Sequence, residues 1–179
     1  MSLIAKSPIY FGPFLVTPQV FYMTSLCFAV VNLKPLLPGH VLVSPIRSVP
    51  RVSDLTAEET AQLFLTVRRV GRMVERVYNA SSLNIAIQDG IDAGQSVPHV
   101  HTHIIPRRRL DLDHRGGSDA IYEMMDGSEG NIAKRLWERM EARSRLPAVD
   151  NEAREARSDE EMLEEAQRLA VEMEKEPLE

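Results

Sequence analysis

Hydrophobic and polar positions divide the N-terminal part of the chain into five expected strands, at residues 20–22, 26–31, 40–44, 83–88 and 99–105. The second of these is an almost uninterrupted apolar run, which is typical of a strand covered on both faces. The last two alternate between apolar and polar side chains, the period of a strand with two different faces.

Prolines and a glycine separate the second expected strand from the third and mark a turn. Asn32 ends the second strand, and His40 begins the third. A turn that joins neighbouring strands should therefore place Asn32 and His40 close together.

Two segments have the three- and four-residue apolar spacing of amphipathic helices. The first begins at Thr56, whose spacing from Glu59 is that of a capping box, and runs to Val77. The second follows a similar box at Ser158 and has a narrower apolar stripe. The pattern leaves open whether this second helix packs on its own domain or pairs with a partner.

Polar and glycine-rich sequence fills the interval before the second helix. Residues 111–151 predict a mobile loop, with a short helix near 132–140. The chain should therefore comprise a compact domain at 1–110, the loop at 111–151 and a charged C-terminal helix at 152–179.

The composition of the 179 residues is that of an ordinary globular domain, with 44% hydrophobic and 26% charged residues. The single cysteine, Cys27, cannot form an internal disulfide, which fits a reducing compartment. Pro8 and Pro13 interrupt the N-terminal segment, so neither a signal peptide nor a membrane span is expected there. We expect a cytoplasmic protein, with the nucleus as a further location.

The net charge of −5 is unevenly distributed along the chain. Residues 150–179 hold twelve acidic and four basic residues, so the remainder has a net charge of +3. A weakly basic body suits a small anionic ligand and is too weak a charge to indicate nucleic acid.

Three of the five histidines fall within five residues, at His99, His101 and His103. In a strand these alternate positions share one face, with β-branched neighbours on the other. Imidazole can act near neutral pH as nucleophile, general base or hydrogen-bond donor. Two other hypotheses remain: a polar strand edge, and a zinc site that would need His40 as a further ligand.

Two neighbouring segments could assist an anionic ligand. Residues 94–98, Gly-Gln-Ser-Val-Pro, precede the histidines and could present backbone N–H groups to an anion. The arginines at 107–109 follow them, either as a solvated surface run or as a source of positive potential.

The run His-Val-His-Thr-His-Ile-Ile at 99–105 resembles the signature of the histidine triad family of nucleotide hydrolases and transferases. Further segments, at 28–32, 38–43, 88–90 and 94–99, occur in the same order as in the fragile-histidine-triad branch, the diadenosine polyphosphate hydrolases. The resemblance extends from about Phe11 to Pro106.

This resemblance implies an α+β fold with one five-stranded antiparallel sheet and two main helices per subunit. It also implies a homodimer, in which two sheets form one of ten strands. No nucleic-acid or membrane partner is expected.

The resemblance also implies roles for individual residues. His101 matches the nucleophile that forms a covalent nucleotidyl-histidine, and His99 and His103 match flanking residues that orient it and contact phosphate. His40 matches a histidine that supports the triad from behind. The remaining matches are Gln88 for the scissile phosphate bridge, Asn32 for the ribose, Gly94, Gln95, Ser96 and Val97 for the phosphate loop, and Tyr122 for a modified tyrosine of an animal relative.

The expected reaction is hydrolysis of diadenosine tri- or tetraphosphate, releasing AMP with ADP or ATP in two displacements at phosphorus. It requires a neutral imidazole fixed in one tautomer, for instance by a carbonyl that accepts from one ring N–H. A magnesium or manganese ion bound with the substrate is expected to help neutralise its phosphates, with no metal held permanently by the protein.

Two other functions share the same site. A nucleoside phosphoramidase would need a strong general acid for its amine leaving group. A nucleotide-dependent signalling module would use the bound complex, and not turnover, as its output.

Overall fold

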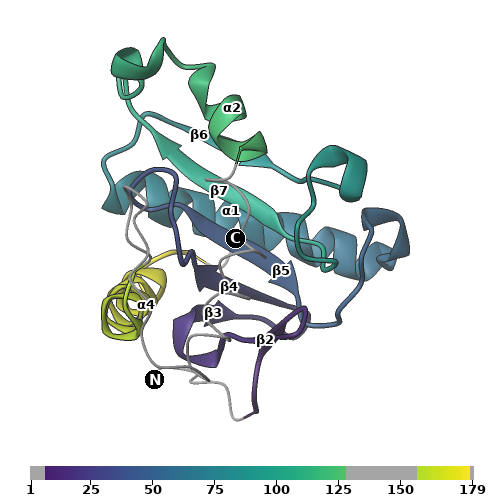
Figure 1. Cartoon of the computed structure of the whole chain (residues 1–179). Coiled ribbons are helices and arrows are strands. Elements are labelled where there is room, and N and C mark those ends of the chain that lie inside the picture. Colours follow the sequence, from purple (N-terminus) through teal and green to yellow (C-terminus); the bar gives the residue numbers. More distant parts are fainter. Residues whose placement is uncertain (1–6, 128–156, 178–179) are drawn as a thin grey trace, which may run out of the picture.

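The computed structural model describes residues 7–127 and 157–177, and its centre is a five-stranded antiparallel sheet in the order β3-β4-β5-β7-β6 (Figure 1). The strands are β3 (Val20–Met23), β4 (Cys27–Val31), β5 (Val41–Pro45), β6 (Ser82–Ala86) and β7 (Thr102–Arg107). All five expected strands are therefore present, with ends shifted by a few residues. The resulting α+β architecture is the predicted one.

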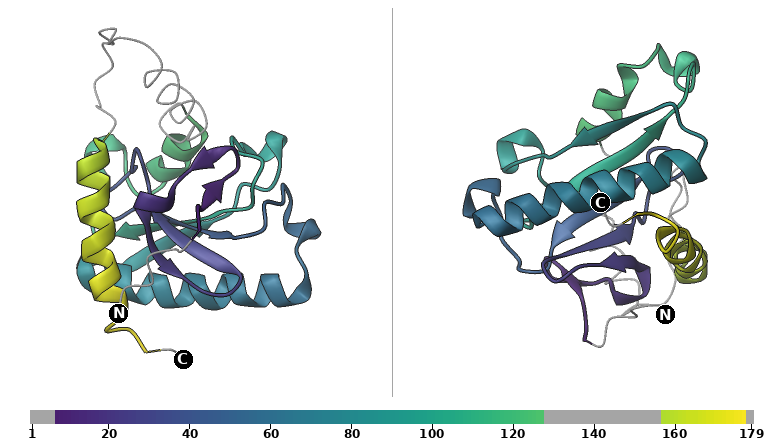
Figure 2. Two further views of the ribbon diagram at one scale, coloured as in Figure 1. Left: turned by 90° about the horizontal axis from the view of Figure 1, so that it is seen from below. Right: turned by 180° about the vertical axis from the view of Figure 1, so that it is seen from behind.

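Helix α1 (Ala57–Val77) covers one face of the sheet, and its capping box at Thr56 and Glu59 is present as predicted (Figure 2). Leu63, Val67 and Val70 of α1 are buried against alternate residues of β4, β5 and β7 in the largest apolar cluster. β4 is buried at every position, which confirms that both of its faces are covered.

The opposite face carries a small hairpin of β1 (Tyr10–Phe11) and β2 (Phe14–Leu15), and α2 (Ala120–Asp126). The hairpin packs on Phe28, Val30 and Leu42, whose side chains point away from α1. Short 3₁₀ turns at Thr17–Gln19, Val52–Asp54, Ile91–Ala93 and Asp113–Arg115 connect these elements.

The loop prediction for 111–151 is wrong at its beginning, where residues 111–127 contain a 3₁₀ turn and α2. Ile121, Met124 and Met125 of α2 form a third apolar cluster with Ile105 and Leu112. A seven-residue helix has too few apolar positions to show a period, so the polar, glycine-containing sequence alone predicts a loop here. The short helix expected at 132–140 lies outside the described residues.

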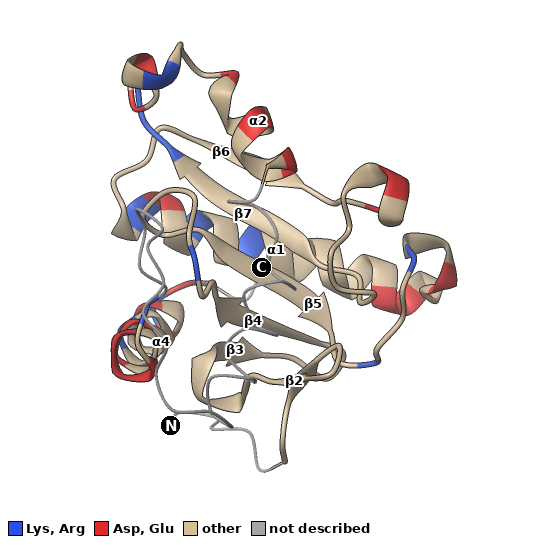
Figure 3. Cartoon of the chain, in the orientation of Figure 1, with Lys and Arg blue, Asp and Glu red and all other residues tan. Residues whose placement is uncertain are grey.

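The C-terminal helix α4 (Asp159–Met173) packs on the domain itself, beside β3 and α1 (Figures 1 and 2). Its capping box at Ser158 and Glu161 is present. Met162, Ala166 and Leu169 belong to the same apolar cluster as α1. Figure 3 shows the acidic α4 near the arginines of α1, which explains how a helix of this charge docks. None of the described helices combines the length and the apolar character needed to cross a membrane.

Candidate active site

The three histidines lie at the start of β7, but only His103 is within the hydrogen-bonded ladder. β7 begins at Thr102 and continues through Pro106 to Arg107, so the expected strand 99–105 is displaced toward the C-terminus. The alternation of faces is still maintained, because Val100 and Ile104 belong to the cluster beneath α1.

His99 is oriented by two backbone groups, and neither of its nitrogens is left for a ligand. The N–H of Gly12 donates to His99 Nδ1 at 3.0 Å, and His99 Nε2 donates to the carbonyl of Pro45 at 2.8 Å. His99 is fully buried, and its ring is stacked on that of Phe11. These bonds fit an orienting role for His99, and its expected contact with phosphate stays a prediction.

The carbonyl oxygen of His99 fixes the tautomer of His101. His101 Nδ1 lies 2.7 Å from this oxygen, and because a carbonyl only accepts, Nδ1 must carry the proton. His101 Nε2 is then a bare lone pair, buried and without a hydrogen-bond partner among the described residues. Sequence reasoning predicted a carbonyl in this role, and the residue that supplies it is the first histidine of the triad.

A second series of hydrogen bonds fixes His40 and His103 in the other tautomer, with the proton on Nε2. The N–H of Leu36 donates to His40 Nδ1 at 3.2 Å, so His40 carries its proton on Nε2. That proton is donated to His103 Nδ1 at 2.9 Å. His103 therefore carries its own proton on Nε2, a buried atom that also has no partner within the described structure.

The two hydrogen-bond chains leave a bare nitrogen on His101 and an N–H donor on His103, whose rings are neighbours. The rings of His101 and His103 have centroids 5.0 Å apart, at an interplanar angle of 60°. One can attack an electrophile while the other donates to an oxygen of the same group.

Burial keeps these rings uncharged. It lowers the pKa of His101 to about 4, and the hydrogen bond to the carbonyl of His99 opposes this shift only in part. It lowers the pKa of His40 to about 3, aided by repulsion from His101 when that ring is protonated and by the positive charge of Arg157. The pKa of His103 is also well below its ordinary value, because of burial and of the neighbouring rings of His101 and His40. All three are neutral at pH 7, as a nucleophilic imidazole requires.

Asn32 and His40 meet at the turn, as the sequence predicted. The amide nitrogen of Asn32 lies 3.4 Å from both ring nitrogens of His40, and its Oδ1 accepts from the N–H of Lys34 at 3.1 Å. Both ring nitrogens of His40 are engaged here by Leu36 and His103, so neither is free to serve as the further zinc ligand in this arrangement. No group of three or more His, Cys, Asp or Glu within the described ranges is arranged to hold a metal ion.

The loop at residues 94–98, before the triad, is held in shape by bonds between side chains and nearby backbone groups. Gly94 has a φ of +86°, and a Cβ there would lie 2.5 Å from the amide nitrogen of Gln88, so these two residues are in close contact. Gln95 accepts from the N–H of Gly90 at 3.0 Å and donates to the carbonyl of Pro50 at 2.8 Å. Its side chain therefore shapes the loop, where a phosphate contact was expected.

Val97 and Arg107, on either side of the triad, are both buried. Val97 is buried in the cluster beneath the hairpin, so only its backbone could face a ligand. Arg107, predicted as surface charge or phosphate potential, is buried and bonds to Asp111 and Asn84. Tyr122 lies on α2 and is 60% exposed.

Three features near the triad were missed by sequence reasoning. Phe11 packs edge-on against His101, with ring centroids 5.0 Å apart, and Gly12 bonds to His99. Arg157 donates to the carbonyl of Asn32 from a position 125 residues away in sequence. None of these contacts has a local sequence signal, because each depends on the tertiary fold.

Comparison with known proteins identifies similar chains. The sequence profile of the HIT domain matches residues 15–110. A Schizosaccharomyces pombe protein named bis(5'-nucleosyl)-tetraphosphatase [asymmetrical] is 48% identical over 170 residues, covering 90% of this chain and 92% of that protein. An Arabidopsis thaliana protein named bifunctional bis(5'-adenosyl)-triphosphatase/adenylylsulfatase FHIT is 53% identical over 127 residues, covering 70% and 69%. The crystal structure of Plasmodium falciparum diadenosine triphosphate hydrolase in complex with Cyclomarin A superposes with a TM-score of 0.68 at 26% identity, covering 97% of this chain and 89% of that one.

Proposed function

Because the chain belongs to the HIT domain family, we propose that it hydrolyses dinucleoside polyphosphates through a covalent intermediate on His101. The observation that carries this proposal is a pair of buried ring atoms that have no hydrogen-bond partner among the described residues: a bare Nε2 on His101 and a protonated Nε2 on the neighbouring ring of His103. The names of the two relatives, a tetraphosphatase and a triphosphatase, support this substrate class.

In the first displacement, His101 Nε2 attacks the α-phosphorus, an N–P bond forms, and the bond to the bridging oxygen breaks. ADP leaves from a triphosphate substrate, or ATP from a tetraphosphate. His103 Nε2–H donates to a phosphate oxygen as negative charge shifts toward the leaving group. In the second displacement water attacks the same phosphorus, the N–P bond breaks, and AMP is released with His101 neutral again.

The other residues have supporting roles in this proposal. Asn32 binds the ribose, Gln88 contacts the bridge, and the backbone of the 94–97 loop contacts phosphate. Magnesium or manganese accompanies the substrate phosphates and supplies charge neutralisation there. Such an ion needs no cage of protein ligands.

Access to His101 requires part of its cover to move. His101 is 1% exposed, and the edge of Phe11 lies against its ring. The hairpin that carries Phe11 is attached to the triad through the bond from Gly12 to His99. Substrate entry in this proposal therefore includes displacement of Phe11.

We also propose a homodimer, formed through the outer edge of β6. A ten-stranded sheet needs two edge strands to pair, and the edges here are β3 and β6. α4 packs against β3, whereas Ile85 of β6 is 49% exposed. Sedimentation equilibrium of Ile85→Asp against the unmodified chain tests this, with a monomeric variant as the expected result.

The central test is replacement of His101 by Ala, with exposed His114 replaced by Ala as the matched control. We expect His101→Ala to lose at least about 10³-fold in kcat on diadenosine tri- and tetraphosphate, and His114→Ala to retain it. Radiolabelled substrate quenched in base should leave acid-labile label on residue 101. Turnover by His101→Ala at a rate comparable to that of the unmodified chain would refute the assignment of His101 as the nucleophile.

The same assay separates the alternatives. Adenosine phosphoramidate and adenylyl sulfate are run beside the dinucleotides, and a higher kcat/KM for phosphoramidate would establish the phosphoramidase instead. A signalling role is supported if His101→Ala binds nucleotide and retains cellular activity.

A further inference from the structure

Arg157, two residues before the start of α4, contacts the segment between Asn32 and His40. The guanidinium of Arg157 donates to the carbonyl oxygen of Asn32, and its backbone N–H donates to the carbonyl of Leu33 at 3.3 Å. Both contacts are to the main chain, so Arg157 determines where the backbone of this segment lies.

Arg157 is itself held in place by α4 and α1. Its guanidinium pairs with Glu165 of α4, and the two side chains are 20% and 14% exposed, so solvent screens the pair only partly. The other carboxylate oxygen of Glu165 accepts from the hydroxyl of Tyr78, which follows α1, at 2.6 Å. The three side chains thus link α4, α1 and the Asn32 backbone.

Tyr78 supports the other end of the same turn. Its ring lies against Gly39, where a Cβ would be 2.6 Å from the ring, and Gly39 has a φ of +85°. Gly39 immediately precedes His40. The turn from Asn32 to His40 is therefore held at its start by Arg157 and at its end by Tyr78.

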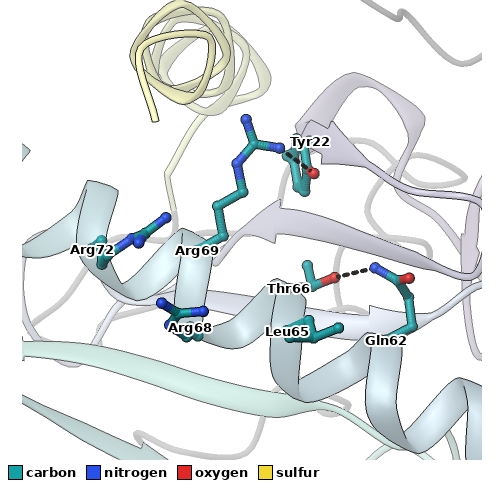
Figure 4. A pocket seen from close by; sticks show the side chains of 7 residues that line it. All are labelled: Tyr22, Gln62, Leu65, Thr66, Arg68, Arg69 and Arg72. Atoms are coloured by element: carbon teal, nitrogen blue, oxygen red, sulfur yellow. Dashed lines mark hydrogen bonds between the residues drawn. The ribbon is translucent and has the colours of Figure 1, made fainter. Parts of the chain in front are cut away.

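The C-terminal end of α4 is anchored separately. Arg69 of α1 donates to the carbonyls of Met173 and Glu176 at 3.3 and 2.8 Å, and to the hydroxyl of Tyr22 at 2.5 Å (Figure 4). Arg76 pairs with Glu172 and Glu176. With Met162 and Leu169 in the main cluster, α4 is a fixed support and not a loose tail.

We infer that Arg157 is a positioning residue for nucleotide binding: by holding the Asn32 carbonyl to α4, it sets the position of the Asn32 amide and of His40. This inference rests on the proposed function, in which Asn32 binds the ribose. The positive charge of Arg157 also favours the neutral form of His40, because it helps to lower the pKa of that ring. A neutral His40 can keep accepting from Leu36 and donating to His103.

The experiment compares Arg157→Ala and Arg157→Lys with Arg76→Ala. Arg76 is the matched control, because it also joins α1 to α4 through carboxylates, and within the described part of the chain it makes no hydrogen bond or ion pair to the Asn32 turn. Ribose contacts act in the ground state and transition state alike, so their loss raises KM more than it lowers kcat. We expect Arg157→Ala to raise KM for diadenosine triphosphate about tenfold, Arg157→Lys to rescue part of this, and Arg76→Ala to leave KM within about twofold.

A second variant and a second measurement cover the case in which Arg157→Ala fails to fold. Glu165→Gln weakens the hold on Arg157 while keeping an amide near Tyr78, and should raise KM about threefold. Long-range ¹H–¹⁵N spectra of His40 and His103 should shift in Arg157→Ala and Glu165→Gln, and remain as in the unmodified chain in Arg76→Ala.

The inference is overturned if the folded Arg157 or Glu165 variants keep both KM and the imidazole signals of the control. It is also overturned if Arg76→Ala raises KM equally, which would indicate a general effect of loosening α4. Absence of dinucleotide hydrolysis by the unmodified chain would instead refute the proposed function, and the imidazole spectra would still test the role of Arg157.

Discussion

The buried neutral imidazoles predict a loss of stability in a defined acidic range. His101 and His40 titrate near their ordinary value of about 6.5 when unfolded, but at about 4 and about 3 in the folded protein. Between these values the unfolded chain binds protons that the folded protein does not, so the free energy of unfolding falls as the pH falls. The stabilisation is fully present above pH 6.5.

The magnitude follows from linkage. Going from pH 7 to pH 5, each of the two histidines should lower the free energy of unfolding by about 2 kcal/mol, or about 4 kcal/mol together. His103 acts in the same direction, since burial lowers its pKa too. Such a loss is a large part of the roughly 5–15 kcal/mol of a typical domain. Carboxylates interfere little above pH 5, because their unfolded pKa values are about 4.

Urea unfolding followed by circular dichroism at pH 7, 6 and 5 measures this loss. His101→Gln should reduce it by about 2 kcal/mol, and replacement of the exposed His114 by Gln is the control. A free energy of unfolding that changes by less than about 1 kcal/mol between pH 7 and pH 5 would refute the neutral buried pair.

Two further predictions concern α4, which packs on the main apolar cluster, and Phe11, which packs against His101. Met162 of α4 is 1% exposed in the main cluster, so Met162→Ala should lower the free energy of unfolding by about 2–5 kcal/mol in urea titrations. Val171→Ala, at a position 56% exposed on the same helix, should change it by less than about 0.5 kcal/mol, and equal effects would contradict docking of α4. Phe11→Ala removes the ring against His101, and should speed modification of His101 by diethyl pyrocarbonate, read by mass spectrometry; an unchanged rate would show that Phe11 does not limit access.

Features with a local cause were predictable from the sequence. Both capping boxes were identified because the pairs Thr56/Glu59 and Ser158/Glu161 interact within one turn. The grouping of the imidazoles followed from a period of two, and the meeting of Asn32 with His40 followed from a short turn. These patterns need only neighbours in sequence.

Features that depend on distant backbone atoms were not predictable. His99 is hydrogen-bonded to the backbone of Gly12 and Pro45, which lie 87 and 54 residues away in sequence. Arg107 looked like surface charge, because Asp111 and Asn84 become its partners only when β6 and β7 pair. The docking of α4 depends on ion pairs between its carboxylates and the arginines of α1. The apolar stripe along α4 does not indicate which element that stripe packs against.

The direction of the protons along His40 and His103 follows from a main-chain group, the N–H of Leu36, which donates to His40 Nδ1. Every amino acid except proline supplies that group, whatever its side chain. Substitution scans that compare side chains would therefore score position 36 for packing alone. The tautomer of His103, the proposed donor next to His101, would depend on the main chain at position 36, and such a scan would not detect this dependence.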